Sequence, residues 1–175
     1  MEFSCETQYD CKATRAMARA LRKTVRRKKS LRSHVFGWCV VAFALILLFW
    51  TEDGGFPFQF RPRTVLTLAV TLALLTVLLF EDRINGYIAY RRMLPGTQKA
   101  RVVFGETEFV SSTGIGTSSF RYDKINLIVE DADWFIFIFS ANHAQVYDKR
   151  RISGGDLEDF RSFLETAIGK AVHRI

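Results

Sequence analysis

The chain has 175 residues, of which 49% are hydrophobic, 14% aromatic and 25% charged, and its mean hydropathy is close to zero. This apolar content excludes a disordered chain, 11 Gly and 3 Pro exclude a collagen-like or low-complexity sequence, and 3 Cys exclude a disulfide scaffold. The charge is uneven, because residues 1–33 hold ten Lys or Arg against three Asp or Glu, whereas the later residues hold equal numbers of both signs. The length allows one domain, or a small domain with an appendage.

The first 33 residues are expected to form a short strand followed by a basic helix. Residues 1–8 (MEFSCETQ) have the length of one strand, and residues 13–33 (ATRAMARALRKTVRRKKSLRS) have a helical pattern. Such a helix suits the surface of an anionic leaflet, although fixing the topology of a following span is the plainer role. Nucleic-acid binding competes as an interpretation, but the run leads directly into an apolar segment, so we expect no nucleic-acid partner. The basic stripe consists of Arg15, Arg19, Arg22, Arg26 and Lys29.

Two apolar runs predict a hairpin of two transmembrane helices over residues 34–80. Residues 33–51 contain no charged residue, and neither do residues 64–80. The second run has seventeen residues, and a helix of that length rises about 25 Å, which is within the range of a membrane span. Two buried core helices in a soluble protein are the alternative, but so small a domain could hardly bury two helices that are apolar all round.

Lys and Arg are distributed unevenly around this hairpin. Ten precede the first run and five follow the second within about twenty residues, whereas the connecting loop, residues 52–63, holds two. The positive-inside rule therefore predicts a multi-pass protein of the inner membrane, with both termini in the cytoplasm and the loop outside. Residues 81–98 are expected to form a helical connector, in which residues 81–94 extend the second span into the cytosol as a helix and Pro95 and Gly96 stop it.

Beyond residue 98 the hydrophobic period changes to two, which predicts a small curved antiparallel sheet. A last helix is expected near Ser153 or Asp156, with acidic residues in its first turn and one apolar stripe. A small sheet closed by a C-terminal helix is the outline of a pleckstrin-homology-like domain over residues 99–175. The predicted fold class is therefore a membrane α-helical hairpin joined to an α+β cytosolic module. The expected strands lie in the runs RVVFG, ETEFVSS, GTSSFRY, INLIVED, DWFIFIFS and HAQVYDK.

The order of these segments is similar to that of a bacterial family. A basic N-terminal helix, two spans and a tail reading RYDKINLIVEDADWFIFIFSANHAQVYDKRRISGGDLEDFRSFLETAI resemble the YcxB-like family, from about residue 10 to residue 170. In both, an aromatic strand follows an acidic turn, and a strand end with Lys or Arg precedes the last helix. The resemblance implies a membrane protein with a pleckstrin-homology-like tail. It implies no activity and carries no functional residues.

The residues that could carry chemistry are scattered along the chain. Cys5, Cys11 and Cys39 lack CxxC spacing and the three His are far apart, so we expect no metal site and no cofactor. Gly-Ile-Gly at residues 114–116 is expected to form a turn rather than a phosphate loop. The acidic cluster at residues 130–133 lacks EF-hand spacing and is expected to form a hairpin turn. No nucleophile and base can be paired, so we predict no catalytic residues and no enzyme.

Two features stand out from this background. Residues 134–139 (WFIFIF) are apolar on both faces of a strand, so one face lines the core and the other needs cover. Cover by the chain itself is the plainer expectation, and lipid or a partner is the alternative. Lys149, Arg150 and Arg151 form a basic cluster after a strand. This cluster is either a solvated loop or a contact for anionic lipid headgroups or an acidic protein partner.

These features favour a binding or scaffolding role for an inner-membrane protein with an unidentified protein partner. An accessory subunit of a transporter or channel is the alternative, although neither span holds a charged residue that would mark an ion path. A membrane-tethered enzyme is the third and least favoured interpretation. Small residues on the second span, such as Ala69 and Ala73, would let a second copy pack closely as a homo-oligomer. The candidate contacts for anionic lipid or a partner are Arg15, Arg19, Arg22, Arg26, Lys29, Lys149, Arg150 and Arg151.

Overall fold

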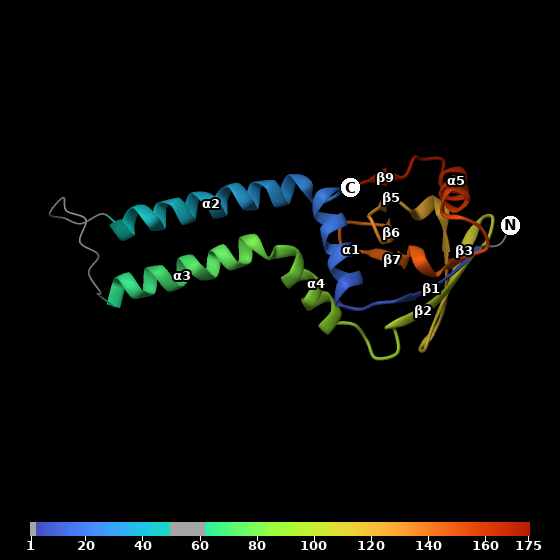
Figure 1. Ribbon diagram of the computed structural model, residues 1–175, viewed down its shortest axis with the longest axis horizontal. Helices are drawn as coiled ribbons and strands as arrows, with labels where there is room; N and C mark the ends of the chain where they lie inside the picture. Colours follow the sequence, from blue (N-terminus) through green and yellow to red (C-terminus); the bar gives the residue numbers. More distant parts are fainter. Residues whose placement is uncertain (1–2, 50–61) are drawn as a thin grey trace.

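The computed structural model describes residues 3–49 and 62–175, and it joins a rod of two helices to a globular body of two sheets (Figure 1). The loop predicted at residues 52–63 lies almost wholly outside these described residues. Over the described part of the chain the fold is α+β. Its helices are α1 (Cys11–Lys23), α2 (Arg27–Phe49), α3 (Pro62–Leu79), α4 (Glu81–Arg91) and α5 (Leu157–Ile168). Its strands are β1 (Phe3–Gln8), β2 (Lys99–Phe104), β3 (Glu108–Thr113), β4 (Gly116–Arg121), β5 (Leu127–Glu130), β6 (Trp134–Ile138), β7 (Ala144–Asp148), β8 (Ile152–Ser153) and β9 (His173–Arg174).

Helices α2 and α3 form the rod and pack along each other through small and β-branched residues (Figure 1). Val41 of α2 and Thr71 of α3 are buried. Gly37 of α2 lies so close to α3 that an added Cβ would stand 2.7 Å from the Leu78 side chain. The opposite side of α3, which includes Ala69 and Ala73, is exposed.

One helical stretch among the described residues, Arg27–Leu48, is long and apolar enough to cross a membrane. Its mean hydropathy is 1.9, and only 6% of its apolar window is buried in the protein. The second apolar run passes the same test only as a bent pair, Thr64–Leu79 followed by Glu81–Arg91, with an angle of 78° between the two helices. The helix expected after residue 80 is present as α4, but the chain bends at Phe80, so α4 does not continue the axis of α3. The two-span hairpin stays a prediction.

The body contains a five-stranded sheet in the order β4-β3-β2-β1-β8 and a four-stranded sheet in the order β7-β6-β5-β9. All neighbours are antiparallel except β9, which runs parallel to β5. The six strands predicted after residue 98 are confirmed as β2 to β7, and the turn at residues 131–133 links β5 to β6 as expected. The N-terminal strand is confirmed too. It pairs along its whole length with β2, from Phe3↔Phe104 to Gln8↔Lys99, so the rod is inserted between two neighbouring strands of one sheet.

Strand β6 is covered on both faces by the chain itself, as expected. Phe135 and Phe137 point into an aromatic core that both sheets share with α5. Trp134, Ile136 and Ile138 belong to a second core beneath α1. All five side chains are buried. The α1 residues that cover them are Ala13, Ala16, Ala20 and Leu21.

The basic N-terminal helix differs from its prediction in length and in place. The expected helix over residues 13–33 is broken, because α1 ends at Lys23 and α2 begins at Arg27. Helix α1 begins where the Asp10 carboxylate accepts hydrogen bonds from the backbone N–H groups of Lys12 and Ala13, at 2.8 and 2.7 Å. Its apolar face packs on β6 and β7 and is therefore not free to enter a bilayer.

The C-terminal helix confirms its prediction. Asp156 caps α5 by accepting hydrogen bonds from two backbone N–H groups, and Gly169 ends it in the left-handed conformation at φ 68°. Phe160 and Leu164 are fully buried. The Phe160 ring makes edge contacts with Phe104 of one sheet and Phe135 of the other, at centroid distances of 5.0 and 5.3 Å. Helix α5 therefore closes the aromatic core between the two sheets.

Candidate functional site

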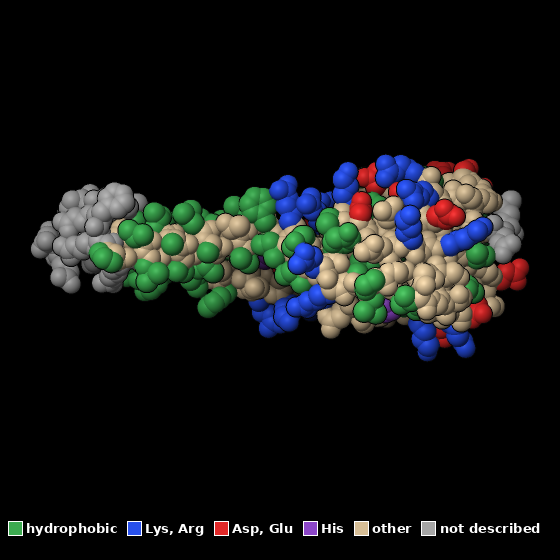
Figure 2. Space-filling model, turned by 90° about the horizontal axis from the view of Figure 1, so that it is seen from below, with side chains coloured by type: hydrophobic (Ala, Val, Ile, Leu, Met, Phe, Trp, Pro, Cys, Tyr) green, Lys and Arg blue, Asp and Glu red, His purple; other side chains and the backbone are tan. Residues whose placement is uncertain are grey.

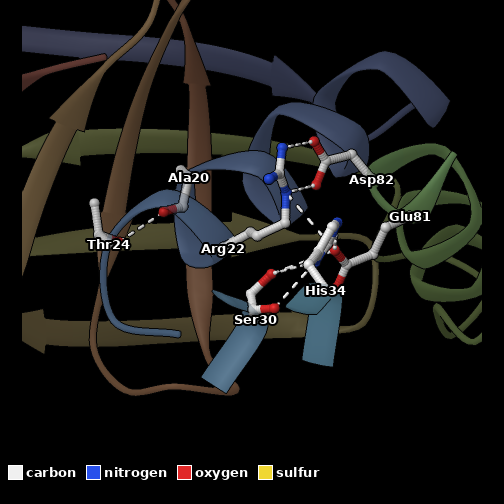
Figure 3. A network of polar contacts seen from close by, with 7 residues as sticks. All are labelled: Ala20, Arg22, Thr24, Ser30, His34, Glu81 and Asp82. Carbon is white, nitrogen blue, oxygen red and sulfur yellow. Dashed lines mark hydrogen bonds and ion pairs between the residues drawn. The ribbon is translucent and has the colours of Figure 1, made fainter. Parts of the chain in front are cut away.

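The rod joins the body at a polar junction between the α1–α2 elbow and the first turn of α4 (Figure 3). The Arg22 guanidinium donates two hydrogen bonds to the Asp82 carboxylate, from Nε to Oδ1 and from Nη2 to Oδ2, both at 2.7 Å. Such two-point pairing fixes orientation as well as distance, because the planar guanidinium matches the carboxylate. The side chains of Arg22 and Asp82 are 33% and 18% exposed, so water screens this pair in part.

A second set of contacts ties α2 to α4 beside this pair (Figure 3). Glu81 Oε2 lies 3.5 Å from His34 Nε2 and accepts a hydrogen bond from the Ser30 hydroxyl at 3.4 Å. The other ring nitrogen, His34 Nδ1, lies 3.0 Å from the Ser30 carbonyl oxygen. Two adjacent carboxylates of α4 thus bind one side chain of α1 and two of α2.

The elbow itself is held by local bonds and by the second sheet. The Thr24 hydroxyl donates to the Ala20 carbonyl at 2.6 Å, which satisfies a backbone acceptor where α1 ends (Figure 3). The Arg26 guanidinium reaches the β6–β7 loop and donates to the Ala141 carbonyl and to Asn142 Oδ1, both at 2.6 Å. The elbow is therefore bonded to both α4 and the body, which makes the junction a fixed joint between rod and body.

The five residues of the predicted basic stripe have different surroundings in the structure, and most of them contact other parts of the protein. Arg22 and Arg26 belong to the junction, and Arg19 lies 3.5 Å from Asp131. Arg15 is half-buried against α4, where its Nε has no hydrogen-bond partner among the described residues. Lys29 is exposed on α2 and makes no ion pair within the described part of the chain. Of the five, Lys29 has the most freedom to meet a lipid or a partner.

The second predicted cluster, Lys149 to Arg151, forms a short 3-10 turn after β7. Lys149 is not in a solvated loop: its side chain is 12% exposed and lies 2.7 Å from Glu130. Arg150 pairs with Asp148 at 3.1 Å, and Arg151 lies 4.0 Å from the same carboxylate. Helix α1 stands between this turn and the rod (Figure 1). Lipid contact by Arg150 and Arg151 stays a prediction.

Glu130 is the centre of a buried ionic network. Sequence patterns had placed it in an acidic cluster that was expected to form a turn. Its carboxylate accepts hydrogen bonds from Lys149 at 2.7 Å and from Arg161 of α5 at 2.9 Å, and Arg174 of β9 lies at 3.4 Å. The hydrogen bonds from Arg161 and Lys149 lower the pKa of Glu130 to about 2, against the opposing effect of burial. Three cations surround this carboxylate, so Glu130 joins β5 to the turn after β7, to α5 and to β9.

A cavity of about 480 Å³ opens on the inner face of the first sheet, beside α1 and α4. Ser111 and Ser118 line it from the sheet, and Met17 of α1 and Met93, which follows α4, line it from the other side. We call it the neutral cavity, because its lining includes His143 but no Lys, Arg, Asp or Glu among the described residues. Its size is that of a small-molecule site, and its lining suits an uncharged ligand with both polar and apolar parts.

Cys5, Cys11 and Cys39 are free thiols. Cys5 is buried, and burial raises the pKa of its thiol to about 12, while Cys11 and Cys39 are exposed. Over residues 3–49 and 62–175 there is no group of three or more His, Cys, Asp or Glu side chains that could hold a metal ion.

Sequence patterns did not reveal the partners at the junction, His34, Glu81 and Asp82. A signal for two of them exists, because the pair Glu81-Asp82 follows an apolar run directly and opposes the sign of the basic helix. What the pattern lacked was the bend at Phe80, which turns the first residues of α4 toward Arg22.

A known protein family matches part of the body of the protein. The matching family model begins at the end of β2, includes β3 to β8 and ends inside α5. Residues 104–164 match the YcxB-like protein family. The resemblance expected from the sequence is confirmed over this YcxB-like segment, which contains Glu130 and the neutral cavity's strands β3 and β4. The polar junction and the rod lie outside it. No curated protein and no solved structure matches the chain.

Proposed function

We propose that α2 and α3 cross the inner membrane as a hairpin and hold a pleckstrin-homology-like binding module on its cytoplasmic side. The observation that carries this proposal is the exposed apolar surface of the rod (Figure 2). Val35, Phe36 and Phe43 of α2 are 56%, 72% and 61% exposed, and Leu66 and Leu72 of α3 are 66% and 56% exposed. An apolar surface this large is typical of a membrane or a partner interface.

The dimensions and charges of the rod support a bilayer as its surroundings. The 23 residues of α2 and the 18 of α3 correspond to about 34 and about 27 Å of helix, close to the ~30 Å thickness of a hydrocarbon core. Lys and Arg side chains gather where the rod meets the body (Figure 2). That distribution supports a cytoplasmic body, because positive residues favour the cytoplasmic side of a span.

The architecture of the body supports a binding role. Strands β1 to β4 form one antiparallel sheet and β5 to β7 another, and α5 closes the core between them. This is the outline of a pleckstrin-homology-like module, with the membrane hairpin inserted after its first strand. The polar junction holds such a module at a set orientation to the bilayer. The neutral cavity gives the module a place for a ligand.

Alkaline carbonate extraction of membranes from cells that express the full chain tests the anchor. We expect the protein to stay in the membrane pellet. Arg at the centre of a span costs about 2.5 to 3.5 kcal/mol, so a Phe43→Arg, Leu72→Arg double variant should be released in part. Ile115→Arg, on the β3–β4 turn and equally exposed at 60%, is the matched control and should stay in the pellet. Release of the unaltered protein into the supernatant would contradict the proposal.

A further inference from the structure

A second cavity, of about 520 Å³, lies at the elbow between α1 and α2, where β9 comes beside the base of the rod. The last turn of α1, the first turns of α2 and the C-terminal strand, which is distant from both in the sequence, build it. Figure 1 places the end of the chain next to the start of α2. The cationic residues that line the cavity are Arg22, Lys23, Arg27 and Arg174.

The charges around this cavity are unbalanced. Asp82 neutralises Arg22, and Glu130, shared with two other cations, lies 3.4 Å from Arg174. Lys23 and Arg27 are exposed and make no ion pair among the described residues. None of the described residues that line the cavity is acidic, and the first turn of α2 contains no acidic residue. Lys23 and Arg27 are therefore two cationic side chains of the cavity without an ion-pair partner among the described residues, and they attract an anion.

The surroundings of the cavity fit an anion that carries a hydrocarbon chain. Leu31, which lines the cavity, is 63% exposed, and Val35 and Phe36 follow on the next turn of α2 with 56% and 72% exposure. The apolar surface of the rod thus begins at the rim of the cationic cavity. Guanidinium and ammonium groups are the side chains that proteins use to bind phosphate. A phosphate with an acyl chain would meet cations at one end and apolar side chains at the other.

We propose that this cavity binds the phosphate of an anionic phospholipid headgroup, with the acyl chains of the lipid lying along α2. The proposal rests on the membrane anchor proposed above, because it needs the base of the rod to lie at headgroup level. Lys23 and Arg27 supply the free charge, and Arg174 brings the C-terminal strand to the same headgroup. The lipid would thereby fix the orientation of the body relative to the membrane surface.

The test is a lipid titration of the full chain in detergent micelles, followed by native mass spectrometry, which counts the lipids retained on each protein. The probes are a phosphatidylglycerol and a phosphatidylcholine with the same acyl chains. A Lys23→Gln, Arg27→Gln double variant removes the two free cations of the cavity. A Lys28→Gln, Arg32→Gln double variant removes the same charge from neighbouring exposed positions that do not line the cavity.

We expect one phosphatidylglycerol to bind in preference to phosphatidylcholine. At about 1 kcal/mol for each cation, the cavity variant should bind it about 30-fold more weakly, and the control variant should stay within about twofold of the unaltered protein. Equal losses in both variants, or no preference for the anionic lipid, would overturn the proposal. Displacement of the lipid by millimolar inorganic phosphate would assign the site to free phosphate instead and would also overturn it.

Carbonate extraction of the same variants separates this proposal from the anchor. If the protein stays in the membrane pellet but shows no selective lipid binding, the cavity proposal fails and the anchor stands. If the unaltered protein is released from the membrane, the anchor fails and the lipid proposal fails with it.

Discussion

At the scale of single residues, the body depends on charges that meet only in the folded chain. Glu130 binds Lys149, Arg161 and Arg174, which come from three different elements. Its spacing along the sequence indicates a turn, and the turn exists, but the spacing carries no information on partners 19 and 31 residues away. For the same reason, the regular stripe of basic residues predicts a helix face and not the acidic groups that Arg19 and Arg22 contact.

Replacing Glu130 with Gln should destabilise the protein most at neutral pH. The pKa of Glu130 is lowered to about 2 in the fold and lies near 4.3 in an unfolded chain, so the carboxylate contributes about 3 kcal/mol above pH 5. That contribution falls as the pH drops from about 4.3 towards 2. Urea denaturation in micelles, followed by tryptophan fluorescence, measures the difference at each pH.

The control for this variant is Glu158→Gln, because Glu158 is an exposed acid on α5. It should leave the free energy of unfolding within about 0.5 kcal/mol of its original value. A difference between Glu130→Gln and the unaltered protein that is equally large at pH 7 and at pH 2.5 would rule out the ionic explanation.

At the scale of elements, periodicity predicted whether each segment forms a helix or a strand. Long-range packing determined where the helices end and where each element lies in the fold. The alternating runs after residue 98 became β2 to β7, and the capped apolar stripe became α5. The break at residues 24–26 and the bend at Phe80 escaped prediction, because the junction contacts between α1, α2 and α4 hold them. Pairing of β1 with β2 escaped for a similar reason, since 90 residues and the whole rod separate the two strands.

The close packing of α1 on α4 depends on Gly86. An added Cβ would stand 2.7 Å from Arg15 Cα and 2.8 Å from its backbone nitrogen, so the two helices would have to separate. Gly86→Ala should therefore destabilise the protein by about 1–3 kcal/mol, although Ala normally favours a helix by about 1 kcal/mol. Thermal unfolding followed by circular dichroism gives the sign of the change.

Asn85→Ala is the matched variant, since Asn85 precedes Gly86 on α4 and is exposed. It should raise stability slightly through helix propensity alone. If both Ala variants raise the unfolding temperature, α1 and α4 are not packed as closely as the structure has them.

At the scale of the whole molecule, charge and apolar surface are divided between its two ends. The rod is apolar, its base is basic, and the body has a balanced surface around two buried cores (Figure 2). The polar junction joins these parts through Arg22, Asp82 and Glu81. The order of apolar and charged residues along the chain predicted this division, because each part of it is built mainly from one continuous segment. Sequence patterns missed the elbow cavity because its walls come from both ends of the chain.

The most direct test of the proposed anchor is the side of the membrane on which each end of the molecule lies. Cys5, Cys11 and Cys39 are replaced, and one cysteine is introduced either at Gly54 or at Thr117, which is exposed on β4. In intact cells, a membrane-impermeant maleimide should label Gly54→Cys, and it should label Thr117→Cys only after the inner membrane is opened. Labelling of Thr117→Cys in intact cells while Gly54→Cys stays protected would contradict the cytoplasmic body, and equal labelling of both would contradict the hairpin.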